Sequence, residues 1–249
     1  MPSGVFIRRS EPILKTVSSP FQNLILASLS REAYSRFAPH LQEVSLTAGD
    51  VLSEPGLIAE NAYFVNTGMV SVLAVLRDGD SLEVGVIGRE GVVDVNMLLG
   101  CRTSLNRVIV QMDATALRMK SSVLTRLYNE ASPQFRASGQ RYIQYRMGQA
   151  SQSAICSHSH DIEERLARWL LLVADTVNSD RFFLTHEFLS QMIGARRSSV
   201  TLAAGVLSVA GIIEYHRGRI AILKRKSLEG LACECYGILK GEYAALATS

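Results

Sequence analysis

Hydrophobic positions change their spacing twice along this chain, at about residues 42 and 120. Residues 21–41 carry apolar side chains at helical spacing, whereas residues 42–119 consist of short alternating apolar runs separated by glycines. Short alternating runs of this kind predict antiparallel strands packed as a barrel or sandwich. We expect strands at 44–46, 51–52, 63–65, 69–76, 82–86, 108–110 and 116–117, with a hairpin turn at Asp78-Gly79-Asp80.

The spacing becomes helical again after residue 120. A short helix is expected at about 121–129, Pro133 opens a helical stretch to about residue 156, and another helix follows from His160 to about Val177. More than about 20 residues without a strong breaker exceed the ordinary length of a globular helix. The small and aromatic side chains of the long helix suit packing against a second copy of the chain, with packing across its own barrel as the alternative. We therefore expect Phe135, Tyr142 and Tyr145 at a dimer interface.

Residues 184–223 are the most informative segment. They predict two short helices joined at Gly194, because glycine allows the backbone conformation that a tight turn requires. Thr185 suits the N-cap of the first helix. The second helix presents Arg197, Ser198 and Thr201 on its outer face. A guanidinium beside short polar groups is the chemistry that reads base edges in DNA.

A basic hairpin follows these two helices. Two short strands enclose a glycine turn at His216-Arg217-Gly218-Arg219, where a winged helix-turn-helix has its wing. Residues 181–226 hold eight Lys or Arg and two acidic residues, a balance of +6, whereas the whole chain has a formal net charge of +3. Positive charge concentrated on a helix-turn-helix pattern indicates DNA binding. A small helical domain with a solvated charged face is the alternative.

Composition and length narrow the class of protein. The chain has 249 residues, of which 47% are hydrophobic, enough for one or two domains with a substantial core. No apolar run is long enough to span a bilayer, and the N-terminus lacks the layout of a signal peptide. We therefore expect a cytoplasmic protein with reduced thiols and no membrane partner. Residues 1–20 contain three prolines and little periodicity, which predicts a loose arm.

Candidate ligands for a metal are few and scattered. Cys101, Cys156, Cys233 and Cys235 lie far apart in sequence except for the Cys-Glu-Cys pair. The clustered cysteines of an iron–sulfur sensor are missing, and two cysteines do not make a closed metal site. We expect neither a metal nor an iron–sulfur cluster, and a packing role for these thiols. A redox or metal role for the Cys-Glu-Cys pair is the alternative.

The histidines do not indicate an enzyme. His158 and His160 are two residues apart, so they would face different sides of a helix, and we expect them in a loop at a domain junction. The sequence contains no nucleophile–base pair in a supporting motif and no His-Glu-x-x-His helix. We therefore expect a protein that is not an enzyme.

Two segments resemble the CRP/FNR family of bacterial transcription regulators. Ala48-Gly49-Asp50-Val51-Leu52 with the segment 63–70 is similar to the family's early β-roll, and residues 184–213 are similar to its helix-turn-helix. The resemblance implies an α+β fold, with a cyclic-nucleotide-binding-like double-stranded β-helix at 1–130, a dimerisation helix at 131–157 and a winged helix-turn-helix at 158–249. It implies double-stranded DNA, a second copy of the chain, RNA polymerase and an unidentified small-molecule effector as partners.

The resemblance also implies an effector pocket, but this chain departs from the family pattern there. Members that bind cyclic nucleotides use an early glutamate for the ribose and a later arginine for the phosphate. Glu90 lies in a similar early segment, whereas Ser104, followed by Leu105, falls where the arginine is expected. Arg102-Thr103 lies two residues early, and a slip of the loop would restore it. Without a positioned guanidinium the pocket loses a bidentate contact, so we expect it not to bind cyclic AMP.

In the recognition helix, Arg197 falls on a base-reading position of the family. Ser198 and Leu202 replace the glutamate and the second arginine of many members, so the half-site should differ from the best-known one. Leu202 would contact a thymine methyl or pack inside. Phosphate contacts are expected from Arg196, Ser199 and the wing arginines Arg217 and Arg219. Our leading hypothesis is a dimeric, effector-responsive transcription factor; a regulatory module that acts on a protein partner, with a degenerate helix-turn-helix, is the alternative.

Overall fold

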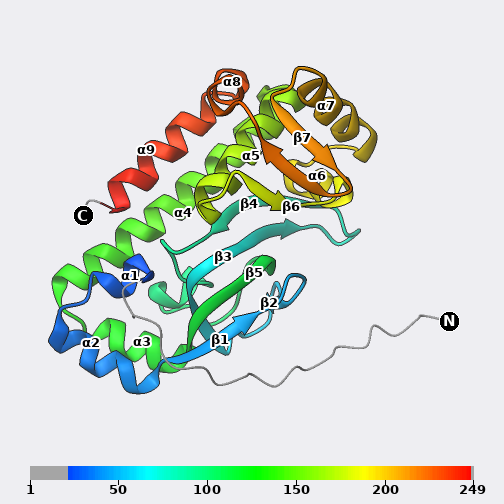
Figure 1. The fold of residues 1–249 in the computed structure, drawn as a ribbon. Coiled ribbons are helices and arrows are strands. Elements are labelled where there is room, and N and C mark those ends of the chain that lie inside the picture. The colour runs from blue at the N-terminus through cyan, green and yellow to red at the C-terminus, as the bar shows by residue number, and fades with distance from the viewer. Residues whose placement is uncertain (1–21, 248–249) are drawn as a thin grey trace.

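The computed structural model describes residues 22–247, so the arm predicted at residues 1–20 lies outside it. Two bodies are joined by one long helix (Figure 1). The first contains five strands together with the short helices α1 (Leu24–Ala27) and α2 (Arg31–Phe37) and the 3-10 turns Ala38–His40 and Val95–Leu99. The second contains the helix-turn-helix. This arrangement is the mixed helix-and-strand fold that the sequence predicted.

The strands of the first body form one antiparallel β-roll sheet. They are β1 (Gln42–Leu46), β2 (Val51–Ser53), β3 (Asn61–Val75), β4 (Ser81–Ile87) and β5 (Arg107–Lys120). Their order is β1-β5-β3-β4, with β2 paired to β5. The turn predicted at Asp78-Gly79-Asp80 joins β3 to β4, with Gly79 at φ +96°.

Two pairs of predicted strands are single long strands in the structure. The segments 63–65 and 69–76 belong to β3, and the segments 108–110 and 116–117 belong to β5. Gly68 lies inside β3 at φ +79°, and the pairing register with β5 shifts on both sides of it. A side chain on Gly68 would clash with the carbonyl oxygen of Asp113. Glycine therefore lets the strand bend without ending, whereas the sequence pattern suggested a turn.

Helix α4 (Pro133–Ser159) follows α3 (Ser121–Asn129), and Ser132 caps it by accepting a hydrogen bond from the Phe135 backbone N–H. Its aromatic side chains face the protein's own core rather than a second copy. Phe135, Tyr142 and Tyr145 are at most 5% exposed. The Phe135 ring packs edge-on against Phe37 at 5.4 Å, and the Tyr142 hydroxyl donates to the Val92 carbonyl at 3.1 Å.

The expected dimer interface at Phe135, Tyr142 and Tyr145 is therefore wrong for these three side chains. Burying aromatic rings against the β-roll removes their apolar area from water within one protomer, which was the alternative interpretation of this helix. A dimer through α4 needs the opposite face of the helix.

The second body begins at α5 (Ile162–Val177) and contains the expected helices and wing. Its elements are β6 (Arg181–Phe183), α6 (His186–Ile193), α7 (Arg197–Val209), β7 (Ile213–His216), β8 (Arg219–Ile222), α8 (Arg225–Leu231) and α9 (Cys235–Ala247). Strand β6 pairs with β8 and was not predicted. Helices α8 and α9 are separated by residues 232–234.

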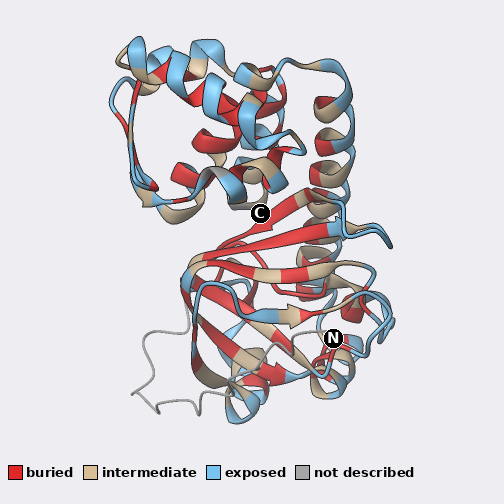
Figure 2. Ribbon diagram, turned by 90° about the vertical axis from the view of Figure 1, so that its right-hand side faces the viewer, coloured by how far each residue is buried: buried red, intermediate tan, exposed pale blue. Residues whose placement is uncertain are grey.

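The two bodies share a hydrophobic core. Met69 and Val86 of the β-roll pack in one buried cluster with Trp169 and Leu170 of α5. In Figure 2 the strands that lie nearest the helical body are coloured mainly as buried. The Trp169 indole N–H donates to Glu83 Oε1 at 2.7 Å, and the Glu83 side chain is buried at this junction. The body that contains the helix-turn-helix thus packs directly on the β-roll of its own chain.

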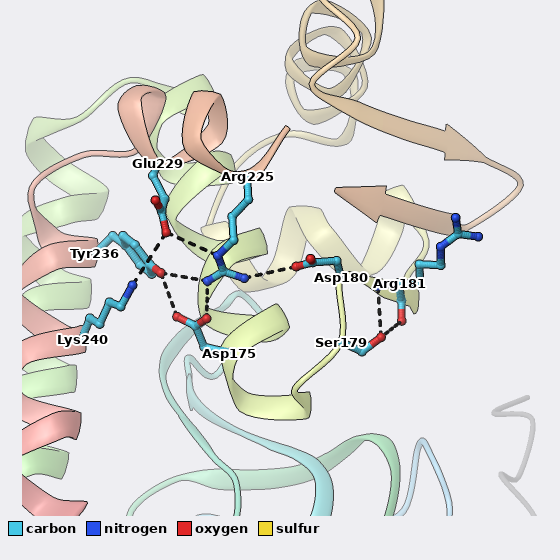
Figure 3. Close-up of polar contacts among 8 residues, drawn as sticks. All are labelled: Asp175, Ser179, Asp180, Arg181, Arg225, Glu229, Tyr236 and Lys240. Atoms are coloured by element: carbon cyan, nitrogen blue, oxygen red, sulfur yellow. Dashed lines mark hydrogen bonds and ion pairs between the residues drawn. The ribbon is translucent and has the colours of Figure 1, made fainter. Parts of the chain in front are cut away.

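A second set of contacts holds the C-terminal helices against α5. Arg225 of α8 bonds Asp175 at the end of α5, Asp180 at 3.1 Å and Glu229 at 3.3 Å (Figure 3). The Tyr236 hydroxyl of α9 donates to Asp175 at 2.8 Å. Helix α9 then runs beside α4 (Figure 1). None of the helices between residues 22 and 247 is long and apolar enough to cross a lipid bilayer.

Candidate nucleic-acid interface and effector cavity

The helix-turn-helix is built as the sequence predicted. Thr185 accepts a hydrogen bond from the Phe188 backbone N–H at 3.2 Å and caps α6. Gly194 ends α6 at φ +59°, the left-handed conformation that favours glycine. The apolar faces of α6 and α7 are buried together, through Leu189, Met192, Ile193, Val200, Ala203, Ala204 and Leu207. The outer face of α7 is consequently fixed as a rigid surface.

That outer face carries most of the predicted contact residues. Arg196, Arg197, Ser198 and Thr201 are exposed, and Ser199 is half-buried. Leu202 is 69% exposed, which excludes the interpretation that it packs inside. A shallow groove runs along α7 between Ser198 and Ala210. Its lining of short polar and apolar groups matches the base edges and thymine methyls of a DNA groove.

Arg197 has a partner that the sequence analysis did not consider. Its guanidinium lies 3.4 Å from the Glu187 carboxylate of α6, and both side chains are more than two-thirds exposed. An exposed ion pair of this kind contributes little to stability. It holds Arg197 over the first turn of α7, the position from which recognition helices contact bases.

The wing is a two-residue hairpin. Arg217 and Gly218 form its tip at φ +47° and +83°, so both central residues have positive φ, as in a type I′ turn. The Leu184 backbone N–H donates to the Gly218 carbonyl at 2.6 Å and joins the wing to β6. Arg217 and Arg219 are exposed on either side of Gly218. The predicted wing is confirmed, and both cations are free to approach a backbone phosphate.

One cation of the basic segment is not available to DNA. Arg225 contributes to the +6 balance, but its guanidinium is bonded to three carboxylates and to the Tyr236 hydroxyl (Figure 3). The hydrogen bonds to Asp175 and Tyr236 raise its pKa, although burial opposes the shift. This charge therefore stabilises the domain instead of contributing to the electrostatic surface.

A candidate effector cavity lies between the β-roll and α4 and has a volume of ≈ 290 Å³. It is lined mainly by apolar side chains, such as Val72, Ile87 and Ile143, with Asp94, Ser104 and Arg146 as its ionisable and hydroxyl groups. Of the four residues predicted for this pocket, only Ser104 lines it. Arg102 and Thr103 are exposed outside it. Glu90 is buried and lines a different cavity, beside α1 and α4, with its carboxylate accepting from the Gly88 N–H at 2.9 Å.

The register of the loop around Ser104 is fixed by backbone hydrogen bonds. The Gly56 N–H donates to the Ser104 carbonyl at 2.9 Å, the Ser104 N–H donates to Leu57 at 3.0 Å, and the Ala59 N–H donates to Arg102 at 3.0 Å. A two-residue slip that brought Arg102 into the phosphate position would break all three. The structure therefore contradicts Arg102 and Thr103 as pocket residues.

Inside the cavity, Ser104 faces a carboxylate. Its hydroxyl donates to Asp94 Oδ1 at 2.7 Å, and Asp94 Oδ2 is buried without a hydrogen-bond partner among the described residues. Burial raises the pKa of Asp94. A charged Asp94 would repel an anionic ligand from its side of the cavity, which the Arg146 guanidinium also lines.

The structure adds two residues to the Cys-Glu-Cys pair that the sequence analysis did not connect with it, Cys156 and His160. Cys156, His160, Cys233 and Cys235 place their ligand atoms within 4.8 Å of one another. The hydrogen bond with Cys233 lowers the pKa of the Cys156 thiol, a shift that burial opposes and Arg168 assists. We expected no metal site because the cysteines are scattered in sequence. The fold brings three of them together with His160, so that reason does not hold. The four-residue spacing of Cys156 and His160 on one helix was the signal that could have shown it.

Comparison with known proteins agrees with this architecture. Residues 43–131 match the family model of the cyclic nucleotide-binding domain, and residues 164–231 match that of the Crp-like helix-turn-helix domain. The transcriptional regulator SdrP of Thermus thermophilus is 25% identical over 199 residues, which cover 77% of this chain and 94% of SdrP.

Solved structures share the fold. FixK2 from Bradyrhizobium japonicum superposes with a TM-score of 0.66 at 18% identity, covering 78% of this chain and 98% of FixK2. A CRP/FNR-family regulator from Thermus thermophilus gives a TM-score of 0.63 at 24% identity. The match covers 77% of this chain and 98% of that regulator. Fold and site thus define a two-domain regulator with a cyclic-nucleotide-binding-like β-roll and a winged helix-turn-helix. The chain belongs to the CRP/FNR family of transcription regulators.

Proposed function

We propose that this regulator acts as a homodimer that binds a palindromic DNA site and responds to an uncharged effector. The observation that carries the DNA-binding part is the exposed outer face of α7, with Arg197 over its first turn and the wing arginines beside it. Arg197 reads a base edge, and Arg217 contacts a phosphate. Bacterial DNA and RNA polymerase lie in the cytoplasm, so that is where we propose the protein works, with polymerase as a further partner.

The proposed dimer uses the outer face of α4. Exposed side chains recur there at alternating spacings of four and three residues, at Gln140, Gln144, Met147, Ser151, Ala154 and His158. This is the heptad spacing of a two-stranded coiled coil, and small residues at such a seam allow close approach of two helices. Met147 is 66% exposed in the single chain, so a second helix packed on this face would remove its apolar area from water.

The dimer is tested by light scattering on the full chain. We expect twice the chain mass at micromolar concentration. Met147→Glu should shift the mass toward the monomer, because two carboxylates would meet across the seam. Ile238→Glu is the matched control, since Ile238 is also an exposed apolar residue but lies on α9. A monomeric wild-type protein, or equal dissociation by both variants, contradicts the proposed face.

DNA binding is tested by selecting sites from random duplexes with purified protein. We expect an inverted repeat whose half-sites differ from those of family members that carry a glutamate and a second arginine in place of Ser198 and Leu202. A protein without sequence preference would instead favour a module that acts on a protein partner. No feature of the described residues favours that second function, since the helix-turn-helix and wing are intact.

The effector is proposed to be neutral and largely apolar, and not cyclic AMP. The support is the Asp94–Ser104 pair in an apolar cavity. Calorimetry with cyclic AMP should show no binding at micromolar concentrations. Asp94→Asn removes the buried charge and should weaken the exclusion of anions. Micromolar affinity of the wild-type protein for cyclic AMP would overturn this assignment.

A further inference from the structure

Four potential metal ligands meet where α4 ends and α9 begins. Cys156 lies in the last turn of α4, and His160 follows four residues later at its C-cap, so both face the same side of the helix. Cys233 and Cys235 come from the break between α8 and α9, 77 residues further along the chain. The fold therefore brings two distant pairs together, and neither pair alone could bind a metal tightly.

The separations of the ligand atoms fit a single tetrahedral ion. Cys156 Sγ lies 3.5 Å from Cys233 Sγ, and Cys235 Sγ lies 3.6 Å from His160 Nδ1. A zinc ion with bonds of about 2.3 Å to sulfur and about 2.0 Å to nitrogen has tetrahedral edges of roughly 3.8 and 3.6 Å. The four ligand atoms are all within 4.8 Å of one another. Bridging sulfides of an iron–sulfur cluster would hold the cysteines farther apart.

We propose that Cys156, His160, Cys233 and Cys235 bind one Zn²⁺ ion with tetrahedral geometry. Three thiolates and an imidazole are soft and borderline ligands that select zinc over magnesium or calcium. Cys156 and Cys235 are 0% exposed and Cys233 is 5% exposed. A closed set of four protein ligands without room for water is typical of a structural site rather than a catalytic one.

The surrounding charges support a metal–thiolate centre. Zn²⁺ with three thiolates carries a net charge of −1. Arg165 and Arg168 of α5 are 7% and 6% exposed, and no carboxylate within the described residues forms an ion pair with either of them. The Arg168 Nε is buried without a hydrogen-bond partner in that same part of the chain. A buried guanidinium is stabilised by a nearby negative charge, and both arginines lie close enough to Cys156 to interact with it electrostatically.

The outer ligand contacts are also those of a metal site. The Gln152 side-chain N–H₂ donates to Cys235 Sγ at 3.0 Å, from one turn before Cys156 on the same helix. A hydrogen bond to a thiolate sulfur orients the ligand and tunes its charge. The ion would therefore fasten α9 to the C-terminal end of α4, at the residue where the chain turns from the long helix into the DNA-binding body.

Elemental analysis of the full-length protein, purified without chelator, tests the proposal. We expect about one zinc per chain. Cys233→Ser and Cys235→Ser should each lower the zinc content at least tenfold after dialysis against a moderate chelator. Cys101→Ser is the matched control, because Cys101 is exposed on the β-roll and should retain the full content. Equal zinc in all four proteins, or none in the wild-type protein after zinc is added, overturns the proposal.

X-ray absorption on zinc-loaded wild-type protein keeps the proposal testable if the serine variants fail to fold. We expect three sulfur neighbours at about 2.3 Å and one nitrogen at about 2.0 Å. Addition of Co²⁺ to the metal-free protein should give the intense near-ultraviolet bands of thiolate ligation. A coordination sphere of nitrogen and oxygen alone contradicts the assignment. A Cys156–Cys233 disulfide found by mass spectrometry in a metal-free protein contradicts it as well and indicates a redox pair instead.

Discussion

Glu83→Gln should remove a pH dependence from the stability of the domain junction. Glu83 is buried between β3, β4 and α5, and burial raises its pKa from 4.5 to about 7, although hydrogen bonds from Ser71 and Trp169 oppose the shift. The Ser71 hydroxyl faces two acceptors, Glu83 Oε2 at 2.7 Å and Gln111 Oε1 at 2.9 Å, but has one proton. With Gln111 Oε1 facing Ser71, a proton on Glu83 satisfies this network, because Glu83 then donates to Ser71 and Ser71 donates to Gln111.

The magnitude follows from the change in pKa on folding. The folded state binds the proton more tightly than the unfolded state, so this stabilisation is complete below about pH 4.5 and is lost as the pH rises through about 7. The rise of the pKa from 4.5 to about 7 corresponds to roughly 3 kcal/mol, at about 1.4 kcal/mol per pH unit. Glutamine stays neutral and can still accept from Trp169. The free energy of unfolding of the variant should therefore equal that of the wild-type protein near pH 4.5. Above pH 7 it should exceed the wild-type value by up to roughly 3 kcal/mol.

The single tryptophan of the chain makes the assay local. Trp169 donates to Glu83, so its fluorescence during urea unfolding reports on this junction. The quantity to compare is the difference in unfolding free energy between variant and wild type between about pH 5 and pH 8. Glu163→Gln, an exposed substitution on the same helix as Trp169, is the control and should give a constant difference. A constant difference for Glu83→Gln as well would refute the reasoning.

We expect further outcomes for four variants. Arg197→Ala should lower discrimination against wrong half-sites by roughly 1–3 kcal/mol. Arg217→Ala should weaken binding to specific and random duplexes alike and reduce the slope of log affinity against log salt by about 0.9. Competition titrations at several salt concentrations check both variants. Phe135→Ala should destabilise the protein by roughly 3–5 kcal/mol, measured by calorimetry, because its ring is 2% exposed. Gly218→Ala should weaken DNA binding without changing site preference, because a Cβ would lie 2.6 Å from the Phe183 ring and displace the wing; an unchanged affinity argues against a wing contact.

The elements that the sequence predicted correctly are those with strong local signals. Thr185, Gly194 and the Arg217-Gly218 turn each satisfy a local backbone requirement, so the helix-turn-helix and wing were recognisable before any tertiary contact was known. The orientation of α4 could not be predicted in the same way. Its 3.6-residue period shows that the aromatic side chains share one face, but it does not show what covers that face. Phe135 and Tyr142 are strongly apolar, and a core and a dimer interface require the same property.

The residues that sequence reasoning placed wrongly or missed depend on long-range contacts. Arg102 lies outside the cavity because the strand-like pairing of residues 56–59 with residues 102–104 fixes its register, which local spacing does not reveal. The pair Cys156 and His160 lies next to the pair Cys233 and Cys235 because α9 runs back along α4. Asp94 was not considered at all, since a lone aspartate in an apolar stretch has no motif. Its role became visible when the fold placed it against Ser104.

Helix α4 connects the proposed effector cavity, the proposed dimer interface and the contact between β4 and the helix-turn-helix body. Met147 lines the effector cavity and also lies on the proposed dimer seam, so a ligand that fills the cavity contacts a side chain that the second copy would cover. Arg146, one residue earlier, donates to the Val86 carbonyl of β4 at 2.9 Å. Glu83 of the same strand bonds Trp169 of α5. If the proposed function is right, an effector that displaces Met147 would change the packing of the two α4 helices against each other. Through Arg146 and β4 it would also change the packing of the helix-turn-helix body on β4. An effector that binds without a preference for one of these arrangements could not regulate DNA binding.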